Sequence, residues 1–357
     1  MPTNQENPRT GPATTFQVRP VCRTLARAAL AALHAPSVLN TQPWRWHIVD
    51  ETAMLYADQR RRLHAVDTAG RLLMLSCGTA LHHACVTLAA DGVDFEVRPF
   101  PADDDPDLLA EVRYRGEARP SAEAQRLRRA ITLRRSDRRP FAGTAVPGEA
   151  LDELRNAAER TGAHLHLTWS RDLTGIALAA GRAAVVQLAD PAYRAELAAW
   201  LRPPGEGHHD GVPVDTLAPS GARPVPIRDF HATGMIPGAS TDADLADREA
   251  RYGIVVTDGD GPADWLTAGV ALSAVLLTAT ADHLATSAMS DLVENEAARI
   301  MLRRTLGNVG YPQIGIRIGV PAGGPPPPKA PRRPSAEVIE VVAEPVPGDA
   351  VPPAGPP

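Results

Sequence analysis

Residues 35–44 hold a dense set of hydrogen-bonding side chains close to an aromatic ring. Their sequence is Ala-Pro-Ser-Val-Leu-Asn-Thr-Gln-Pro-Trp. The two prolines restrict the backbone and predict a stiff, non-helical loop that carries Ser37, Asn40 and Gln42. A side-chain amide offers a donor and an acceptor together, which suits the edge of a planar ring bearing C=O and N–H groups. The plainer interpretation is a connecting loop between a helix and a strand.

Residues 133–141 form the densest charge cluster, Leu-Arg-Arg-Ser-Asp-Arg-Arg-Pro-Phe. Four arginines and a hydroxyl at the end of a predicted helix could hold a phosphate, because each guanidinium presents a fork of donors that matches phosphate oxygens. The alternative is a solvated basic helix terminus, stabilised by the helix dipole.

Arg317 lies within an apolar strand predicted over 310–319. It stands between Ile316 and Ile318, where a buried guanidinium is costly unless it meets a fixed anion. The plainer interpretation is an edge strand whose alternation turns Arg317 away from the isoleucines.

The elements that must position these motifs follow from apolar periodicity. The helices predicted over 68–90 and 265–284 are apolar almost all round, which is typical of deeply buried helices. Further helices are predicted over 23–35, 121–133, 147–161, 174–188 and 191–200, and strands over 44–49, 52–57, 95–98, 110–114, 164–169 and 252–257.

The chain also shows signs of internal duplication and of irregular segments. Residues 67–70 (Asp-Thr-Ala-Gly) and 266–269 (Leu-Thr-Ala-Gly) open the two buried helices in a similar way, which predicts a duplicated unit. Residues 203–241 are rich in Pro, Gly, His and Asp, and a loop of this length is a functional lid or disordered. We expect a disordered leader over 1–20, and a proline-rich tail over 322–357 that is extended or disordered and carries no chemistry.

Composition bounds the partners and the compartment. The net charge of -5 over 357 residues argues against a nucleic-acid binder that works by broad phosphate neutralisation. The three cysteines lack metal-ligand spacing, and neither His208-His209-Asp210 nor the Asp-Gly-Asp-Gly of 258–261 has a complete ligand set. The polar N-terminus is no signal peptide and no uninterrupted apolar run is long enough for a membrane span. We therefore expect a cytoplasmic protein without a metal.

Together the amide loop, the arginine cluster and the Arg-Ile-Gly strand resemble the signatures of the nitroreductase-like FMN flavoprotein superfamily. In ordinary members the Arg-x-Ser motif precedes the Asn-x-Gln-Pro-Trp loop, whereas here it follows by about a hundred residues. That order resembles the double-length, dormancy-associated actinobacterial branch known as the Acg family, over roughly residues 21–320. The resemblance implies an α+β fold of two related units fused as a pseudo-dimer, over 21–118 and 119–321. Each unit would have a central, mainly antiparallel sheet and a long buried helix.

The resemblance also implies a single FMN between the halves, because no second Arg-x-Ser cluster precedes residue 23 and no Arg-Ile-Gly strand closes the first half. A cation near N1/O2 of the flavin would stabilise the reduced ring. The implied cofactor-binding residues are Arg134, Arg135 and Ser136 with Arg317 at the phosphate and ribityl chain, Arg138 near N1/O2, Asn40 at the pyrimidine edge with Pro36, Ser37 and Gln42 on that wall, and Ser287, whose segment 286–289 supplies a backbone contact to N5.

Three functions follow from these expectations. The first is NAD(P)H-dependent reduction of nitroaromatic or quinone-type acceptors, with NAD(P)H and acceptor using one open flavin face in turn. The second is an FMN-sequestering protein in which 203–241 covers the flavin and turnover is small. The third, a flavin-free interaction protein, needs all three motifs to be coincidental. An internal pseudo-dimer predicts a monomer or a weak homodimer, and the physiological acceptor is not identified by the sequence.

Overall fold

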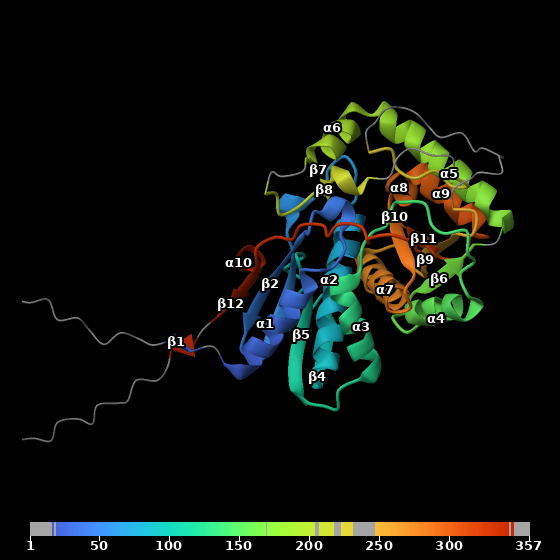
Figure 1. The fold of residues 1–357 in the computed structure, drawn as a ribbon. Coiled ribbons are helices and arrows are strands. Elements are labelled where there is room, and N and C mark those ends of the chain that lie inside the picture. The colour runs from blue at the N-terminus through green and yellow to red at the C-terminus, as the bar shows by residue number, and fades with distance from the viewer. Residues whose placement is uncertain are drawn as a thin grey trace, which may run out of the picture.

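The computed structural model describes residues 16–17, 19–168, 170–203, 207–217, 223–230, 247–342 and 344–345. Two β-sheets flank a central pair of long helices, α2 (Arg71–Ala90) and α7 (Pro262–Ala281), which pack against each other (Figure 1). This arrangement confirms the expected α+β fold.

The two sheets share one order of elements. In each, a helix precedes two strands, a 20-residue helix follows, and two more strands complete an antiparallel sheet. The strand order is β2-β3-β5-β4 in the first sheet and β6-β9-β11-β10 in the second. The first set comprises α1 (Pro20–Ala32), β2 (Trp44–Val49), β3 (Thr52–Ala57), β4 (Val93–Pro99) and β5 (Leu108–Glu117); the second comprises α4 (Gly148–Glu159), β6 (His164–Leu167), β9 (Arg251–Thr257), β10 (Ala285–Met289) and β11 (Tyr311–Gly319).

The remaining elements connect or cover these two sets. Helix α3 (Ala122–Leu133) links the halves, and its N-cap Ser121 accepts a hydrogen bond from the backbone N–H of Ala124 at 3.2 Å. The others are α5 (Ser170–Ala189), α6 (Pro191–Ala199), β7 (Leu201–Arg202), β8 (Val212–Pro213), α8 (Asp291–Glu294), α9 (Glu296–Thr305), α10 (Ser335–Val338), β12 (Ile339–Val341), and the short pair β1 (Phe16–Gln17) and β13 (Glu344–Pro345).

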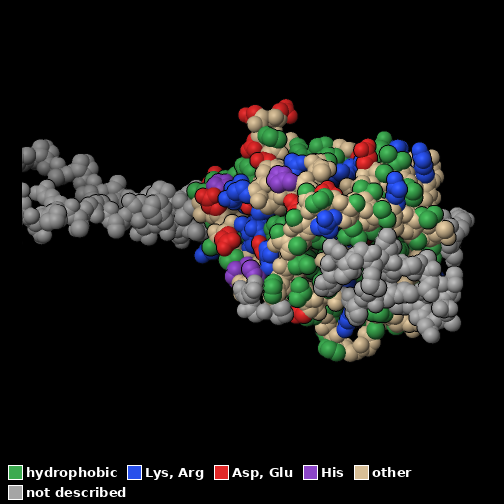
Figure 2. Space-filling model, turned by 90° about the horizontal axis from the view of Figure 1, so that it is seen from above, with side chains coloured by type: hydrophobic (Ala, Val, Ile, Leu, Met, Phe, Trp, Pro, Cys, Tyr) green, Lys and Arg blue, Asp and Glu red, His purple; other side chains and the backbone are tan. Residues whose placement is uncertain are grey.

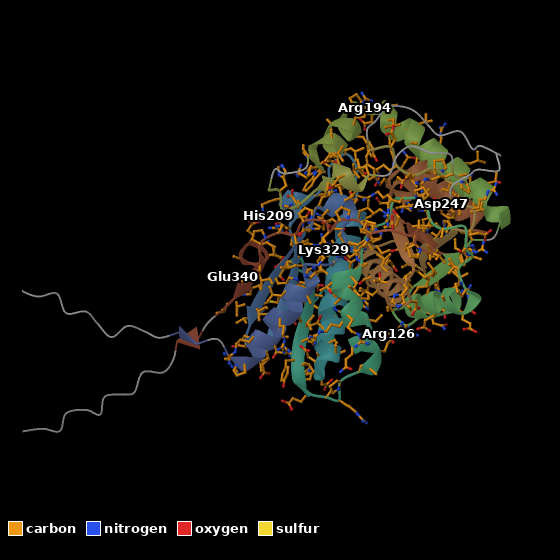
Figure 3. All side chains as sticks on the ribbon, viewed as in Figure 1. Arg126, Arg194, His209, Asp247, Lys329 and Glu340 are labelled. Carbon is orange, nitrogen blue, oxygen red and sulfur yellow. The ribbon has the colours of Figure 1, made fainter. Side chains whose placement is uncertain are left out.

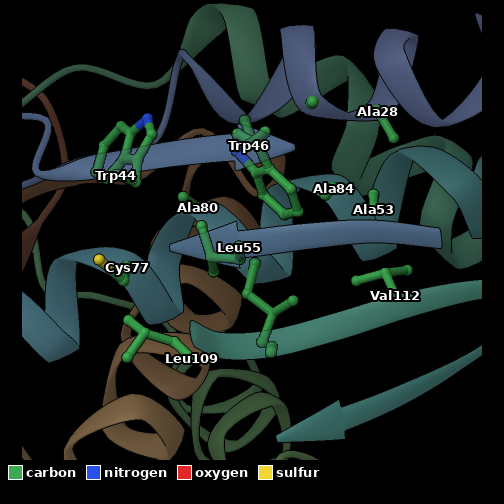
Figure 4. Packing of buried hydrophobic residues seen from close by; sticks show 14 of the residues in the cluster. Ala28, Trp44, Trp46, Ala53, Leu55, Cys77, Ala80, Ala84, Leu109 and Val112 are labelled. Atoms are coloured by element: carbon green, nitrogen blue, oxygen red, sulfur yellow. The ribbon is translucent and has the colours of Figure 1, made fainter. Parts of the chain in front are cut away.

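Small side chains let α2 lie close to the first sheet. Cys77, Ala80 and Ala84 face the sheet, while Trp44 and Trp46 fill the space beside them (Figure 4). Both α2 and α7 are long and apolar enough to cross a membrane, and α5 and α6 qualify only as a pair bent by 92°. The protein itself buries 78% of the apolar window in α2 and 67% of that in α7, which accounts for their composition.

The helices α2 and α7 cross at two glycines. A Cβ atom on Gly78 would lie 2.1 Å from the carbonyl oxygen of Leu266, and one on Gly269 would lie 2.0 Å from that of Leu75. The contact is reciprocal, so residues 75–81 (Leu-Ser-Cys-Gly-Thr-Ala-Leu) correspond to 266–272 (Leu-Thr-Ala-Gly-Val-Ala-Leu). The internal match predicted from 67–70 was therefore wrong by eight residues, since Gly70 lies before α2 with a φ of 76°.

One turn further on, the same register brings His82 against Ser273, with 2.8 Å between Nδ1 and Oγ. The next residue, His83, places its Nδ1 3.0 Å from the same hydroxyl. Burial lowers the pKa of His82 to about 4, so the ring is neutral at pH 7. Both histidines thus serve the contact between the central helices.

Several predicted boundaries move by a few residues. Helix α1 begins at Pro20, a favoured first helical residue, and ends at Ala32 before the loop. The strands predicted over 95–98 and 110–114 extend to Val93–Pro99 and Leu108–Glu117 through their mutual pairing. Of the expected leader, residues 1–15 and 18 lie outside the described residues.

The tail, expected over 322–357 to be extended or disordered, also contains a short helix and a strand, and its residues 343 and 346–357 lie outside the described residues. After β11, residues 320–338 return across the molecule from the second half to the first (Figure 1). Strand β12 then pairs in parallel with β2, and Val338 is buried in the first core. Arg333 anchors the crossing, because its backbone N–H donates to Gln42 Oε1 at 2.9 Å and its guanidinium lies 3.6 Å from Asp58. A short β strand after a proline-rich run carries too little periodicity to be read from sequence.

The glycine crossing gives a stability prediction. Gly78→Ala and Gly269→Ala each place a methyl group against a backbone carbonyl, so each should lower the free energy of unfolding by about 1–3 kcal/mol. Gly181→Ala is the matched control, because Gly181 is also helical and has open space at its Cβ position. It should raise stability by about 0.5–1 kcal/mol. Urea denaturation followed by far-UV circular dichroism measures all three, and equal effects at Gly78 and Gly181 would contradict the close crossing.

Candidate functional site

Two adjoining cavities lie where the halves meet. They share Pro36, Ser37, Leu39, Ser136 and Arg138, and their empty spaces, including the part open to solvent, are about 820 and 960 Å³. The first is largely apolar, with Leu72 and Leu75 from α2, Leu272 from α7, Met289 from β10 and Ile314 from β11. The second is basic. One continuous site is therefore apolar at one end and cationic at the other.

The loop over 33–43 forms one wall. Its 3₁₀ turn at Val38–Asn40 needs positive φ angles at Leu39 (46°) and Asn40 (55°), and Gln42 follows with 49°. Asn adopts this conformation readily and Leu does not, so the fold must hold it in place. Helix α2 does this, because Ser76 Oγ accepts from the N–H of Val38 at 3.2 Å and Thr79 donates to the carbonyl of Pro36 at 2.6 Å.

The two amides of this loop have different surroundings. Asn40 lines the basic cavity, donates to the carbonyls of Gly211 and Pro331 at 3.0 and 3.1 Å, and accepts from Arg332 at 3.1 Å. Gln42 is fully buried outside both cavities and donates to the carbonyl of His209 at 3.0 Å. Gln42 thus positions the loop against two other segments.

The arginine cluster forms the opposite wall. Ser136 pairs with Thr286 of β10, and the N–H of Asp137 donates to the carbonyl of Thr286 at 2.8 Å. This pairing brings the cluster beside Ser287, which is 7% exposed and lines the apolar cavity. Arg135 lines the basic cavity and donates to the last carbonyls of α3, including that of Leu133 at 2.9 Å.

Arg134 and Arg138 carry charges without a carboxylate partner among the described residues. Arg134 is 7% exposed, and its Nε has no hydrogen-bond partner there. Burial, with Arg332 and Arg135 nearby, lowers the pKa of Arg134 to about 9. Burial also lowers the pKa of Arg138 to about 10; this side chain donates to Thr216 Oγ1 at 3.4 Å and lies 5.1 Å from the Phe230 ring. Both sites favour binding of an anion, which would offset these charges.

Arg317 lies outside both cavities. Its strand β11 runs between β10 and β9, so the edge-strand interpretation was wrong. The guanidinium is fully buried, pairs with Asp247, and donates to the carbonyls of Asp137 and Arg139 at 2.7 and 3.0 Å. Arg317 therefore fixes the backbone of the arginine cluster from beneath.

The tail supplies cavity residues that the sequence reasoning missed. Lys329, the one lysine of the chain, and Arg332 line the basic cavity together with His34. Figure 3 shows Lys329 on the tail between the two sheets, with Asp247 in the second half. The basic cavity has five Lys or Arg side chains and no Asp or Glu among its described lining residues. The sequence signal for this part of the site was Lys329 close to Arg332 and Arg333. The proline-rich composition around these residues led us to expect no function there.

Described parts of 203–241 border both cavities. Residues 211–213 and Thr216 line the basic cavity, while Ile227, Arg228 and Phe230 line the apolar one. Residues 204–206, 218–222 and 231–241 lie outside the described residues. Two of the carboxylates considered for metals bind arginines: Asp210 pairs with Arg61 and Arg202, and Asp260 pairs with Arg71 and Arg299.

Comparisons with known proteins identify relatives of this chain. No family model matches the chain. The Mycobacterium tuberculosis protein Rv3131, named "Putative NAD(P)H nitroreductase", is 34% identical over 335 residues, which is 92% of this chain and 95% of that protein. The M. tuberculosis protein acg, named in the same way, is 34% identical over 323 residues, or 89% and 95% of the two chains. This chain belongs to the nitroreductase family.

Solved nitroreductase structures match a smaller part of the chain. The FMN-dependent NfnB of Mycobacterium smegmatis, in complex with NADPH, covers 56% of this chain and 89% of its own, at 16% identity and a TM-score of 0.35. A Bacteroides fragilis nitroreductase with bound FMN covers 56% and 90%, at 14% identity and a TM-score of 0.34.

The pairing beneath the arginine cluster gives a second prediction. Asp247→Asn removes the carboxylate that faces Arg317 and Arg223, so it should lower the free energy of unfolding by about 3–5 kcal/mol. Asparagine tolerates the φ of 65° at this position, which limits the change to charge. Asp258→Asn is the control, because its side chain is 92% exposed; its effect should stay within about 0.5 kcal/mol. Thermal or urea unfolding of both variants is decisive.

Proposed function

We propose that this chain binds one FMN in the cavity between its halves and uses it for NAD(P)H-dependent reduction of nitroaromatic or quinone-type acceptors. The observation that carries the proposal is Arg134, a buried guanidinium without a carboxylate among the described residues, at the basic end of an otherwise apolar cavity. A flavin mononucleotide matches this arrangement, because it has a largely apolar ring at one end and an anionic phosphate at the other. Bound FMN would accept a hydride from NAD(P)H and deliver electrons to the acceptor.

The residues present fit this group. Arg134, Arg135, Ser136, Lys329 and Arg332 would hold the phosphate end, because they surround the basic cavity. Arg138 and Ser287 border the apolar cavity, beside Pro36 and Ser37. Asn40 lines the basic cavity and would meet the cofactor there. Gln42 and Arg317 act as positioning residues, since neither lines a cavity.

We further propose that the chain is a fused pair with one intact site. The matching strand orders and the reciprocal glycine crossing support this, because an isologous contact places each element against its own counterpart. The loop corresponding to 33–43 is the connection over 160–163, between α4 and β6. Four residues cannot form the same wall. The internal pairing supports a monomer or weak homodimer, which sedimentation equilibrium would test.

The second candidate function is FMN sequestration. Phe230 lies between Arg138 and Arg228, at 5.1 and 5.6 Å from their guanidinium carbons, and lines the apolar cavity. A segment in this position would limit access of a nicotinamide to the flavin. The same protein therefore supports either turnover or retention, according to how readily this segment opens.

Removing the Arg134 charge tests the cofactor assignment. Arg134→Gln should weaken FMN binding about 10- to 100-fold, because a charge-assisted hydrogen bond contributes about 1.5–3 kcal/mol. Its affinity for riboflavin, which lacks the phosphate, should stay unchanged. Arg129→Gln on the same helix is the matched control, since Arg129 is exposed. Fluorescence titration of the apoprotein measures both ligands. Equal losses for FMN and riboflavin would show that Arg134 does not meet the phosphate.

Anaerobic addition of NADPH separates the two functions. Rapid bleaching of the flavin absorbance would support the reductase, whereas yellow protein that ignores NADPH would support sequestration. In that second case Phe230→Ala should accelerate bleaching, because it removes the aromatic ring that covers the cavity. The substitution leaves the ion pair between Arg223, in the same segment, and Asp247 in place. A preparation that takes up no FMN would contradict both functions.

A further inference from the structure

The apolar cavity has a polar corner that the cofactor assignment does not use. Arg228, from the segment over 223–230, and Asp291, at the start of α8, both line this cavity. The Arg228 side chain is 8% exposed and Asp291 is 7% exposed. Two buried ionisable groups at the wall of an apolar cavity are costly, so their role needs a physical reason.

Arg228 has one half of its guanidinium committed and the other half unused. Its Nη2 pairs with Glu294 and donates to Ser290 Oγ at 2.9 Å. Its Nη1 is buried and has no hydrogen-bond partner among the described residues. Glu294 is itself fixed, because Tyr193 and Gln187 donate to its Oε2 at 2.9 and 3.1 Å. The network therefore leaves one buried nitrogen of a cavity-lining guanidinium without a hydrogen-bond partner among the described residues.

Asp291 lies in the same corner. Arg228 has an ion pair with Glu294, whereas the Asp291 carboxylate has no such ion pair among the described residues. Its backbone carbonyl accepts from Gln187 Nε2 at 3.1 Å, which fixes the start of α8. Burial raises the pKa of its carboxyl to about 6, although the nearby Arg228 charge acts in the opposite direction and the Glu294 charge raises it further. Asp291 can thus carry a proton near neutral pH.

We propose that Arg228 and Asp291 form the acceptor site of this cavity, where Arg228 Nη1 donates to a carbonyl or nitro oxygen and Asp291 supplies a proton to it. This inference rests on the proposed reductase function. For a quinone, reduction to the hydroquinone takes up one hydride, which originates from NAD(P)H, and one proton. The hydride's electron pair reduces the ring and its hydrogen ends in the O–H group at one quinone oxygen. The proton of the Asp291 carboxyl forms the O–H bond at the other oxygen, and the resulting carboxylate regains a proton from water.

The groups around Asp291 favour this transfer. Arg228 comes from the segment over 223–230, Glu294 from α8 and Tyr193 from α6. Asp229 borders a further, smaller cavity that Arg228 and Asp291 also line, and Arg138 lines the apolar cavity itself. After transfer, the Asp291 carboxylate lies beside the Arg228 cation. The proton donor is active below its pKa, so the acceptor-reduction rate should fall as the pH rises through about 6.

Recognition by Arg228 is tested by binding without reduction. Menadione and 2-methylnaphthalene share a ring system and a methyl group, and only menadione carries the two oxygens. Wild-type protein without reductant should prefer menadione, measured by isothermal titration calorimetry. Arg228→Lys keeps a cation on Glu294 but lacks the second nitrogen, so it should lose about tenfold or more of that preference. Glu296→Gln, an exposed change on α9, should keep it. An unchanged preference in Arg228→Lys overturns the proposal.

Proton donation by Asp291 is tested by a pH profile. Protein reduced beforehand is mixed with menadione between pH 5 and pH 8, and reoxidation is followed by absorbance. The wild-type rate should decline above about pH 6, whereas Asp291→Asn should be slower and insensitive to pH in this range. The same decline in Asp291→Asn would overturn the assignment.

The two proposals fail in different ways. Flavin content and thermal unfolding of each variant are measured first. Protein that binds FMN but does not distinguish menadione from 2-methylnaphthalene keeps the cofactor assignment and overturns the acceptor site. Protein that binds no FMN contradicts the proposed function, and the menadione preference of the flavin-free chain then still measures the role of Arg228.

Discussion

The close crossing of α2 and α7 is the constraint on which the rest of the molecule depends. At Gly78 and Gly269 no side chain separates the helices. The carbonyl groups of Leu266 and Leu75 therefore occupy the space that a Cβ atom at Gly78 or Gly269 would need. This contact sets the distance between the two sheets. Because α2 and α7 also supply Leu72, Leu75 and Leu272 to the apolar cavity, the same contact sets its width. The site exists only where the halves are held together.

Charge is distributed unevenly around that contact. Over the face in Figure 2, basic and acidic side chains are interspersed, and many arginines in the structure pair with a carboxylate. At the basic cavity the pairing stops, and Arg134 lies in the fields of Arg332 and Arg135 without a carboxylate among the described lining residues. A fold stabilises such a group of cations poorly unless an anion joins it. Below the cluster the cations are paired, because Asp247 neutralises Arg317 and Arg223.

The tail joins the two halves by a route that is separate from the helix crossing. It leaves β11, passes the basic cavity with Lys329 and Arg332, and ends as a strand on the first sheet. Proline-rich backbone suits this path, because it stays extended without hydrogen bonds of its own. Arg333 and Glu337 then secure it beside Asp58. In the proposed function, sequestration and turnover share this framework and differ in the segment over 223–230.

The sequence by itself determined the strands Trp44–Val49 and Thr52–Ala57, the two buried helices, and the motifs that line the cavity, because periodicity and proline placement act locally. Only the tertiary structure decided which charges are satisfied. The resemblance implied the same phosphate-binding role for Arg134 and Arg317, yet Arg134 lies at a cavity without a carboxylate among the described residues and Arg317 lies on Asp247. The counterpart of Gly269 and the role of Lys329 were also decided there. Such partners are far apart in the chain, and local pattern carries no information about them.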